Sequence, residues 1–274
     1  MQLSRPLVGF LVVLVVLTGL LWANKTYRTY KTNGTNMSNT TAGFPTTNYQ
    51  LLTSSPQLPN PTPTTSPQQS TTSFQLPTAF SLKNVPFTSQ APSKNWDAVH
   101  EEFCEEAVIL VATEYFIGKY KDKIPIDYAE SQLNDIKNWE MQKFGYFEST
   151  NINQTAQILT EKYNLKTEII DNPTIEQIKI AIYSDKLVIA PAAGRLLKNP
   201  NFTGLGPIYH MLVISGWDKT GFITQDVGTR KGQNYHYSYE TLLNAIHDLY
   251  DNAKLPLDEI KIINGDKKII IISH

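Results

Sequence analysis

This chain lacks disulfide chemistry, because Cys104 is the single cysteine among its 274 residues. One thiol forms neither an internal disulfide nor a cysteine-rich metal site. An unpaired thiol in an oxidising compartment is also open to oxidation, which favours a chemical reason for its presence over a packing reason. A lone cysteine on a helix is most often a small buried hydrophobe. The role of Cys104 is therefore the first question that the sequence raises.

The chain also lacks a strong charge of either sign. Its 24 Lys and Arg residues and 25 Asp and Glu residues leave a formal net charge of −1. No basic stripe with interleaved aromatic residues appears, although such stripes are typical of nucleic-acid binding. We therefore expect no nucleic-acid partner, and we expect neither a cofactor nor a bound metal.

Charged residues are missing from the segment 6–23, PLVGFLVVLVVLTGLLWA. This apolar run is near the length that spans a bilayer, so residues 1–23 are predicted to be an uncleaved membrane signal anchor. A cleaved signal peptide is the alternative, but Leu21-Trp22-Ala23 fits a cleavage site poorly. Basic residues flank the run on both sides, so the positive-inside comparison does not fix its orientation.

Apolar residues are scarce over 24–80, where Thr, Ser, Asn, Pro and Gln dominate, as in LPNPTPTTSPQQSTTS. Such a segment cannot bury enough apolar surface to offset the entropy lost on ordering. We predict a disordered tether that its prolines stiffen locally. A polar tether behind an anchor fits a single-pass protein of the cell membrane, with residues 81–274 held outside the cytoplasm.

Residues 81–274 are enough for one domain with a substantial core. Apolar residues at helical spacing predict helices over 103–117, 126–143, 153–163, 173–183 and 239–250. Asp171 or Asn172 is expected to cap the fourth of these, with Pro173 in its first turn. Short β-like runs predict strands over 187–190, 209–216, 221–225, 234–237, 259–263 and 267–272, with hairpin turns at 217–220 and 264–266. Helices first and an antiparallel sheet second indicate an α+β fold.

Cys104 falls in the first turn of the predicted helix 103–117, where the positive end of the helix dipole is expected to lower the pKa of a thiol. His210 begins the alternating strand HMLVISGW, and Asp226 follows the next strand. A histidine can pair with a thiolate and protonate a leaving amine, while an acidic residue fixes its tautomer. Alone, His210 would be a core histidine and Asp226 a turn residue. Their order after a helix-start cysteine predicts the triad of a cysteine hydrolase.

Such chemistry also needs hydrogen-bond donors to the oxyanion. The backbone N–H of Cys104 is one donor, and Gln90 in VPFTSQ is the best side-chain candidate, with an ordinary surface glutamine as the alternative. Four glutamates flank the thiol, at positions 101, 102, 105 and 106. Close to sulfur they would raise its pKa. We therefore expect them to point away from the cleft or to select a basic substrate group.

Two other histidines are weaker candidates. His100 would have to fold back over the sulfur to act as a rival base. His247 and Asp248 are adjacent on a predicted helix, and adjacent side chains diverge, so we expect a structural or cleft-edge residue rather than a metal site. Three cations near the strands are candidate contacts to an acidic group or a chain terminus, namely Arg195, Lys198 and Arg230.

Three stretches carry a resemblance to a known family: VPFTSQAP with NWD and CEEA, AGRLL with NPNFTGLGPIYHMLVI and GW, and GFITQDVGTRKGQNY with YSYETLLNAIHDL. They resemble the bacterial papain-like cysteine peptidases related to the bacteriocin-leader peptidases, the C thirty-nine-like family, over nearly all of 81–250. The resemblance implies a papain-like fold with Cys104 as nucleophile, His210 as base, Asp226 as orienting residue and Gln90 as oxyanion donor. Relatives often carry Gln shortly before the cysteine. Here that position is Glu101, which leaves the donor role to Gln90.

Together these features predict a membrane-anchored, extracytoplasmic cysteine peptidase that cleaves peptide or protein substrates through a thioester acyl-enzyme. A catalytically silent papain-like module that binds a peptide or the cell wall is the alternative. Acyl transfer of the transglutaminase or deamidase type stays open as well, because it uses the same intermediate.

Overall fold

The structure, a computed structural model, describes residues 75–274. The predicted anchor and the predicted tether up to residue 74 lie outside the described residues and stay predictions. Within the described part of the chain, no helix is both long enough and apolar enough to cross a bilayer.

The described chain folds into helices and one antiparallel sheet. The helices are η1 (His100–Glu102), α1 (Cys104–Ile117), α2 (Ile126–Lys143), α3 (Ile152–Glu161), α4 (Ile175–Tyr183), η2 (Gly194–Leu197), α5 (Tyr239–Ala245) and α6 (Glu259–Ile263). The strands are β1 (Phe80–Ser81), β2 (Lys166–Asp171), β3 (Leu187–Ala193), β4 (Tyr209–Trp217), β5 (Gly221–Gln225), β6 (Tyr235–Ser238) and β7 (Lys268–Ser273). Their order is β2-β7-β3-β4-β5-β6, with β1 beside β4. The α+β class expected from the sequence is confirmed.

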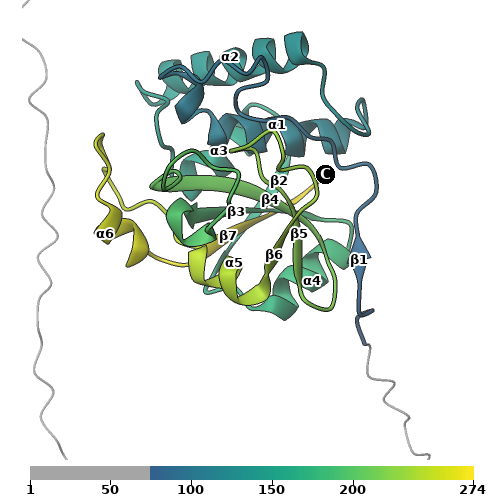
Figure 1. Cartoon of the computed structure of the whole chain (residues 1–274). Coiled ribbons are helices and arrows are strands. Elements are labelled where there is room, and N and C mark those ends of the chain that lie inside the picture. The colour runs from purple at the N-terminus through teal and green to yellow at the C-terminus, as the bar shows by residue number, and fades with distance from the viewer. Residues whose placement is uncertain (1–74) are drawn as a thin grey trace, which may run out of the picture. The chain divides into compact units, whose positions relative to one another are not determined.

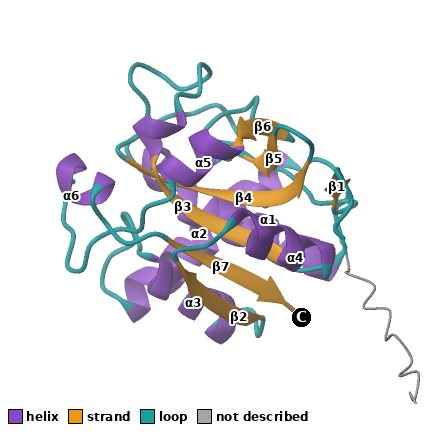
Figure 2. Ribbon diagram, turned by 90° about the horizontal axis from the view of Figure 1, so that it is seen from below, coloured by secondary structure: helices purple, strands orange, loops and turns teal. Residues whose placement is uncertain are grey.

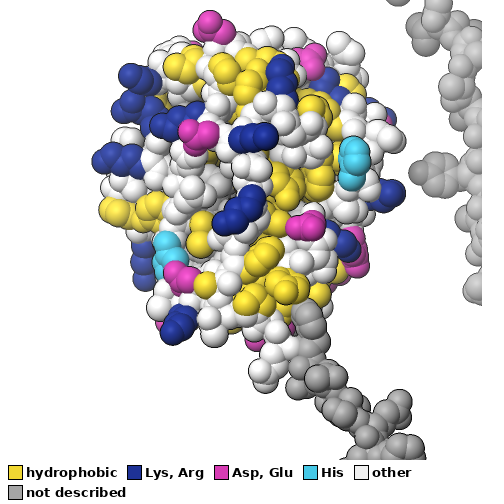
Figure 3. All heavy atoms as spheres, turned by 90° about the vertical axis from the view of Figure 1, so that its right-hand side faces the viewer, with side chains coloured by type: hydrophobic (Ala, Val, Ile, Leu, Met, Phe, Trp, Pro, Cys, Tyr) yellow, Lys and Arg dark blue, Asp and Glu magenta, His cyan; other side chains and the backbone are white. Residues whose placement is uncertain are grey.

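Helices cover both faces of the sheet. Figure 1 shows α1, α2 and α3 on one side and α4 and α5 on the other. Figure 2 shows the strands from the α4 and α5 side, running from β2 across to β6. Helix α1 packs against β4 and lies between the sheet and α2. The face turned to the viewer in Figure 3 mixes exposed apolar side chains with charged side chains of both signs.

Helix α1 is buried on nearly all sides because the sheet, α2 and α3 surround it. Every side chain from Cys104 to Glu114 is buried. The sequence predicts a single apolar stripe, but the run AVILVA supplies apolar side chains to every face of the helix. The helix ends at Ile117, as predicted, and Gly118 after it takes the left-handed conformation with φ 71°. One consequence is that the acidic residues of α1 enter the core with it.

The segment 259–263 is a helix, α6, and not the predicted strand. Asp258 explains the difference, since its carboxylate accepts hydrogen bonds from the backbone N–H groups of Ile260 and Lys261 and so caps a helix. The turn 264–266 therefore joins a helix to β7 and does not close a hairpin. Strand β7 pairs instead with β2 and β3.

Strand β2 was not predicted, so the helices do not all precede the sheet. Its sequence KTEIID is mostly polar because β2 is an edge strand, paired only with β7. Helix α4 begins later than predicted. Thr174, and neither Asp171 nor Asn172, caps it in a capping box with Gln177, and Pro173 lies before the helix.

Helix α5 is shorter than predicted, ending at Ala245, so the pair His247 and Asp248 is not helical. Ile246 instead forms an isolated bridge with Ala192 of β3. The buried Asp248 carboxylate accepts the N–H of Ile152 at 2.9 Å and so satisfies the start of α3. Burial raises the pKa of Asp248 to about 6. These contacts give Asp248 a structural role.

The predicted boundary between tether and domain, at residues 80 and 81, falls inside strand β1. Phe80 pairs with Trp217 of β4, and the Trp217 indole N–H donates to the carbonyl of Pro77 at 3.1 Å. Gly216 allows this close approach, because a Cβ there would lie 2.3 Å from Ser81 Oγ. The last residues of the predicted tether are thus part of the packed domain.

A pair of buried carboxyls, Glu106 of α1 and Glu140 of α2, lies between these two helices. Burial, followed by the charge of Glu140, raises the pKa of Glu106 well above its usual range. Burial also raises the pKa of Glu140 to about 8, with Glu148 adding to the shift. No other donor among the described residues reaches their four side-chain oxygens. A proton held between the two carboxyls is the arrangement that burial favours.

This pair makes stability fall as pH rises. Carboxyls of the unfolded chain titrate near 4.5, whereas Glu140 holds its proton to about pH 8 in the folded chain. The contribution of this pair to the free energy of unfolding is therefore largest below pH 4.5, and it is lost as pH rises through 8. Glu140→Gln stays neutral, so at pH 9 it should be more stable than the natural chain by about 1–3 kcal/mol. Urea unfolding at pH 5 and pH 9 measures this difference.

Glu161→Gln is the matched control. Glu161 is exposed and Lys143 lowers its pKa, so it stays ionised over this range and its removal should leave the pH dependence unchanged. A Glu140→Gln chain that loses as much stability as the natural chain between pH 5 and pH 9 would contradict the account.

Candidate active site

Cys104 is the first residue of α1, as expected, and its side chain is 6% exposed. The turn η1 leads directly into the helix, with Phe103 at the N-cap position. The backbone N–H groups of this first turn have no partner within the helix and point outward at the sulfur end. The helix start therefore presents both a thiol and backbone N–H groups to the same space.

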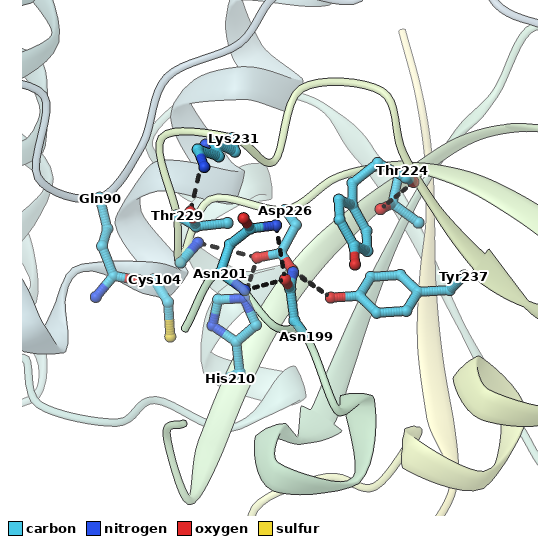
Figure 4. Close-up of polar contacts among 12 residues, drawn as sticks. Gln90, Cys104, Asn199, Asn201, His210, Thr224, Asp226, Thr229, Lys231 and Tyr237 are labelled. Carbon is cyan, nitrogen blue, oxygen red and sulfur yellow. Dashed lines mark hydrogen bonds and ion pairs between the residues drawn. The ribbon is translucent and has the colours of Figure 1, made fainter. Parts of the chain in front are cut away.

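His210 lies near the start of β4, and Asp226 directly follows β5, its antiparallel neighbour. The His210 Nε2 atom is 2.9 Å from Asp226 Oδ1, and the two side chains are 1% and 0% exposed. In Figure 4 the ring of His210 lies beside Cys104, and its second nitrogen is on the side of the sulfur. The structure thus brings together the three residues that the sequence predicts to form the triad.

Two residues that sequence reasoning missed hold Asp226 in place. Asn199 Nδ2 donates to Asp226 Oδ2 at 2.9 Å, and the hydroxyl of Tyr237 donates to the same oxygen. Burial opposes the charge on Asp226, but His210 and these donors keep the pKa of the carboxyl below its usual range. Both residues lie in the strings that carry the family resemblance, yet only the fold shows that they converge on Asp226.

Gly228 fixes the position of the His210 ring from the other side. Its N–H donates to Asp226 Oδ1 at 3.0 Å. A Cβ at this position would lie 2.7 Å from His210 Cε1. The absence of a side chain here lets the loop after β5 close over the histidine.

Gln90 lines the same space, but its amide is already engaged. The side chain is buried, and its Nε2 donates to the carbonyls of His100 and Glu101, both at 2.9 Å. These two bonds use both protons of the amide. For Gln90 to donate to an oxyanion, one of these two hydrogen bonds to a carbonyl would have to break.

The thiol of Cys104 donates to Glu105 Oε2 at 3.0 Å, and no hydrogen bond joins sulfur to His210 in the described structure. Burial raises the pKa of Cys104 well above its usual range, the charges of Glu105 and Glu106 add to the effect, and the N–H of Met211 opposes it. The sequence argument from the helix dipole expects a lowered pKa. That expectation is wrong for this state, because burial and neighbouring carboxyls outweigh the dipole.

The four glutamates around the thiol divide into two pairs. Glu101 and Glu102 line the cleft and are exposed or half-buried. Glu105 and Glu106 are buried: Glu105 also lines the cleft and contacts the sulfur, whereas Glu106 lies against Glu140. Neither predicted arrangement, pointing away or contacting substrate, therefore describes all four.

The cleft in front of the thiol has a volume of about 940 Å³. Cys104, His210 and Gln90 line its floor, and Trp96, Phe202 and Leu257 are among its apolar walls. Asp226 lies behind His210 and does not line the cleft. Polar and apolar side chains line this space in about equal parts, and its volume is in the range of a ligand site.

The chain has a structural likeness to known proteins, but no family model and no curated protein matches it. The chain is similar to the crystal structure of a "putative C39-like peptidase" from Bacillus anthracis, at 14% identity and a TM-score of 0.47. The match covers 72% of this chain and 98% of the other.

The fold has the papain-like arrangement that the sequence predicts. The thiol begins a helix, and that helix packs against an antiparallel sheet whose adjacent strands carry the histidine and the aspartate.

His100 is held away from the sulfur between two carboxylates. Its Nδ1 is 2.7 Å from Asp97 Oδ1, and its Nε2 is 2.9 Å from Glu130 Oε2. Although burial opposes the charge, these partners raise the pKa of His100. Both ring nitrogens are therefore occupied, and His100 ties η1 to α2 instead of acting as a rival base.

The remaining candidate residues do not line the cleft, with the exception of Arg230. The Nδ1 atom of His247 is 2.8 Å from the carbonyl of Gly265, and Arg195 forms an ion pair with Glu259. Lys198 is exposed and does not line the cleft, whereas Arg230 does. Among residues 75–274 no group of three His, Cys, Asp or Glu side chains is placed to hold a metal.

The hydroxyl of Tyr237 should matter for reactivity and that of Tyr235 should not. Tyr237→Phe removes a donor from the buried Asp226 carboxylate, which raises its pKa and loosens the hold on His210. We expect labelling of Cys104 by a peptidyl vinyl sulfone to slow by about tenfold at pH 7. The acid limb of the pH profile of this labelling rate should shift to higher pH.

Tyr235→Phe is the matched control, because this ring packs on Tyr237 at 4.8 Å between centroids while its hydroxyl has no hydrogen bond to Asp226. Labelling rates measured for both variants over pH 5–9 decide the matter. Equal losses in the two would assign the effect to packing.

Proposed function

We propose that this chain is a cysteine peptidase that hydrolyses peptide bonds with Cys104 as nucleophile, His210 as base and acid, and Asp226 as orienting residue. The buried His210–Asp226 contact of 2.9 Å beside a helix-start thiol carries the proposal. Burying a histidine and a carboxylate costs desolvation free energy, and apolar side chains can often replace such a pair without loss of stability. A buried pair at a cleft is therefore better explained by a role in chemistry than by a role in folding. Cys104 and His210 line a cleft large enough for a peptide segment, and Asp226 lies behind the histidine.

In the proposed reaction, His210 takes the proton of the Cys104 thiol and the sulfur attacks the carbonyl carbon of the scissile bond. The C–N bond of the resulting tetrahedral intermediate then breaks, and the imidazolium gives its proton to the leaving amine. A thioester remains on Cys104. Water, deprotonated by His210, attacks this thioester and releases the carboxylic acid and the thiol. Asp226 stays ionised throughout and fixes the ring by its contact with Nε2.

Two donors are proposed for the oxyanion. The backbone N–H of Cys104 lies in the first turn of α1 and needs no rearrangement. Gln90 Nε2 is the second, and it exchanges its contact with the Glu101 carbonyl for the oxyanion. An exchange of this kind makes the donor available only when substrate charge develops beside it.

The proposed location is the outer face of the cell membrane. The uncharged run at 6–23 supports a single-pass anchor, and the polar segment 24–80 supports a spacer between membrane and domain. A peptidase on a tether would meet peptide or protein substrates near the membrane surface.

One observation favours a second candidate, a catalytically silent module that binds peptides in the same cleft. The thiol donates a hydrogen bond to Glu105, and the raised pKa of Cys104 disfavours the thiolate. Such a module would keep the cleft and lose the chemistry. Acyl transfer to an amine would instead keep both, because it differs from hydrolysis only in the acceptor that resolves the thioester.

The test uses the full-length chain in membranes with a peptidyl vinyl sulfone. Labelling should occur at Cys104, vanish in Cys104→Ala and slow by about a hundredfold or more in His210→Ala. Profiling of cleaved peptides from a proteome should show products that Cys104→Ala does not make. His100→Ala should retain labelling, since His100 is held by carboxylates away from the sulfur.

Identical cleavage patterns for the natural chain and Cys104→Ala would reject peptidase activity. Absence of labelling, with alkylation of the thiol only at high pH, would favour the silent module. If His100→Ala abolished labelling and His210→Ala did not, the assigned base would be wrong.

A further inference from the structure

The acceptor of the thiol hydrogen bond, Glu105, has no part in the reaction proposed above. Its Oε2 accepts the Cys104 thiol at 3.0 Å, its side chain is 1% exposed, and its Oε1 has no partner among the described residues. A carboxyl that is buried with one oxygen unpaired is costly, so a contact that it makes to the nucleophile calls for an explanation.

We propose that Glu105 is a positioning residue that holds the Cys104 thiol protonated in a hydrogen bond to its own carboxyl, so that sulfur must leave Glu105 before it reacts. The inference rests on the proposed thiol chemistry and adds a resting state to it. In this state His210 keeps its contact with Asp226, and the sulfur makes its hydrogen bond to Glu105, the next residue of α1, and not to His210. The nucleophile and its base are both in the cleft but are not engaged with each other.

The groups facing this contact are all acids, apart from the histidine. Glu102 comes from η1, Glu106 from the same helix, Glu140 from α2 and Tyr209 from β4, while His210 of the same strand lines the cleft with Cys104. Burial raises the pKa of Glu105 to about 8, and the nearby charges of Glu102 and Glu140 add to it. No Lys or Arg forms an ion pair with Glu105 in the described structure.

Electrostatics then dictates how the contact behaves. Once Glu105 is ionised, a thiolate beside it would put two negative charges about 3 Å apart in a buried site, which is strongly unfavourable. The sulfur that stays on Glu105 is therefore a thiol, and thiolate forms where the sulfur faces His210. Substrate that fills the cleft and needs the sulfur at its carbonyl draws it across. The reactive form is thus reached on demand, while the resting thiol is protected from oxidation, which proceeds through thiolate.

Glu105→Gln tests this role through the pH profile of Cys104 alkylation by iodoacetamide, measured on the full-length chain. The amide cannot ionise, so the second negative charge never forms. The alkylation midpoint should fall by about one pH unit or more, and at pH 9 the variant should react about tenfold faster. At pH 6, where Glu105 is neutral in both chains, the rates should be similar.

Glu106→Gln is the matched control, since Glu106 is an equally buried neighbour that does not contact sulfur. Its midpoint should move less than that of Glu105→Gln. Equal shifts in the two variants would assign the effect to charge in general and overturn the specific contact. An unchanged midpoint in Glu105→Gln would overturn it as well.

The S–H stretching band supplies a second measurement that needs no variant. Because Cys104 is the single cysteine, this band reports on it alone. A carboxylate accepts a stronger hydrogen bond than a neutral carboxyl, so the band should move to lower frequency as Glu105 ionises near pH 8 and vanish only at higher pH. A band already absent at neutral pH, or placed where a thiol without a hydrogen bond absorbs, would contradict the proposal.

These outcomes separate from those of the proposed function. Vinyl sulfone labelling that depends on His210, together with an unmoved alkylation midpoint in Glu105→Gln, would reject the resting contact and keep the peptidase. A shifted midpoint without any His210-dependent labelling would keep the contact and reject the peptidase.

Discussion

The buried contact between His210 and Asp226 is the interaction on which the rest of the site depends. It requires β4 and β5 to pair in one register, because a shift of one residue would turn His210 to the opposite face of the sheet. Strand β4 pairs with β3 on one edge and with β5 on the other, and Val213 lies opposite Gln225, the residue before Asp226. Asn199 and Tyr237 then compensate the buried charge on Asp226, and Gly228 leaves room for the ring. Each of these features serves to keep the His210–Asp226 contact in place.

A second constraint opposes the first. Helix α1 must be buried to carry its thiol into the cleft, and its acidic residues are buried with it. A helix start stabilises a nearby negative charge by about 0.3–1 kcal/mol, and by about 2 kcal/mol in favourable geometry. Full burial shifts a pKa by as much as about 3–5 units, which is a larger effect. At Cys104 the effect of burial on the pKa therefore exceeds that of the helix dipole. His210 has to stabilise the thiolate, because the helix dipole alone does not.

Sequence reasoning predicted the elements that combine a clear period with a clear stop. Helix α1 ends just before Gly118, and strands β4 and β5 alternate around a turn in which Asp218 accepts the N–H groups of Thr220 and Gly221. It failed where tertiary context decides the structure. Strand β2 is too polar for its pattern to show, and the alternation in 259–263 suits a short capped helix as well as a strand.

The candidate site divides in the same way. The order and element types of the triad are visible in the sequence, because each residue lies at the end of a periodic segment. The convergence of Asn199 and Tyr237 on Asp226 joins segments far apart in the chain, which no spacing rule reveals. The burial of Glu105 and Glu106 runs against the usual exposure of glutamate, so sequence rules assign them to the surface.

A crystal structure of the chain with a peptidyl aldehyde tests the central claim most directly. The account predicts a hemithioacetal on Cys104, with the N–H of Cys104 donating to its oxygen and the ring of His210 within hydrogen-bond reach. Sulfur should no longer contact Glu105, and the His210–Asp226 contact should persist. An aldehyde that binds without a bond to sulfur, or an adduct whose nearest base is a residue other than His210, would contradict the account.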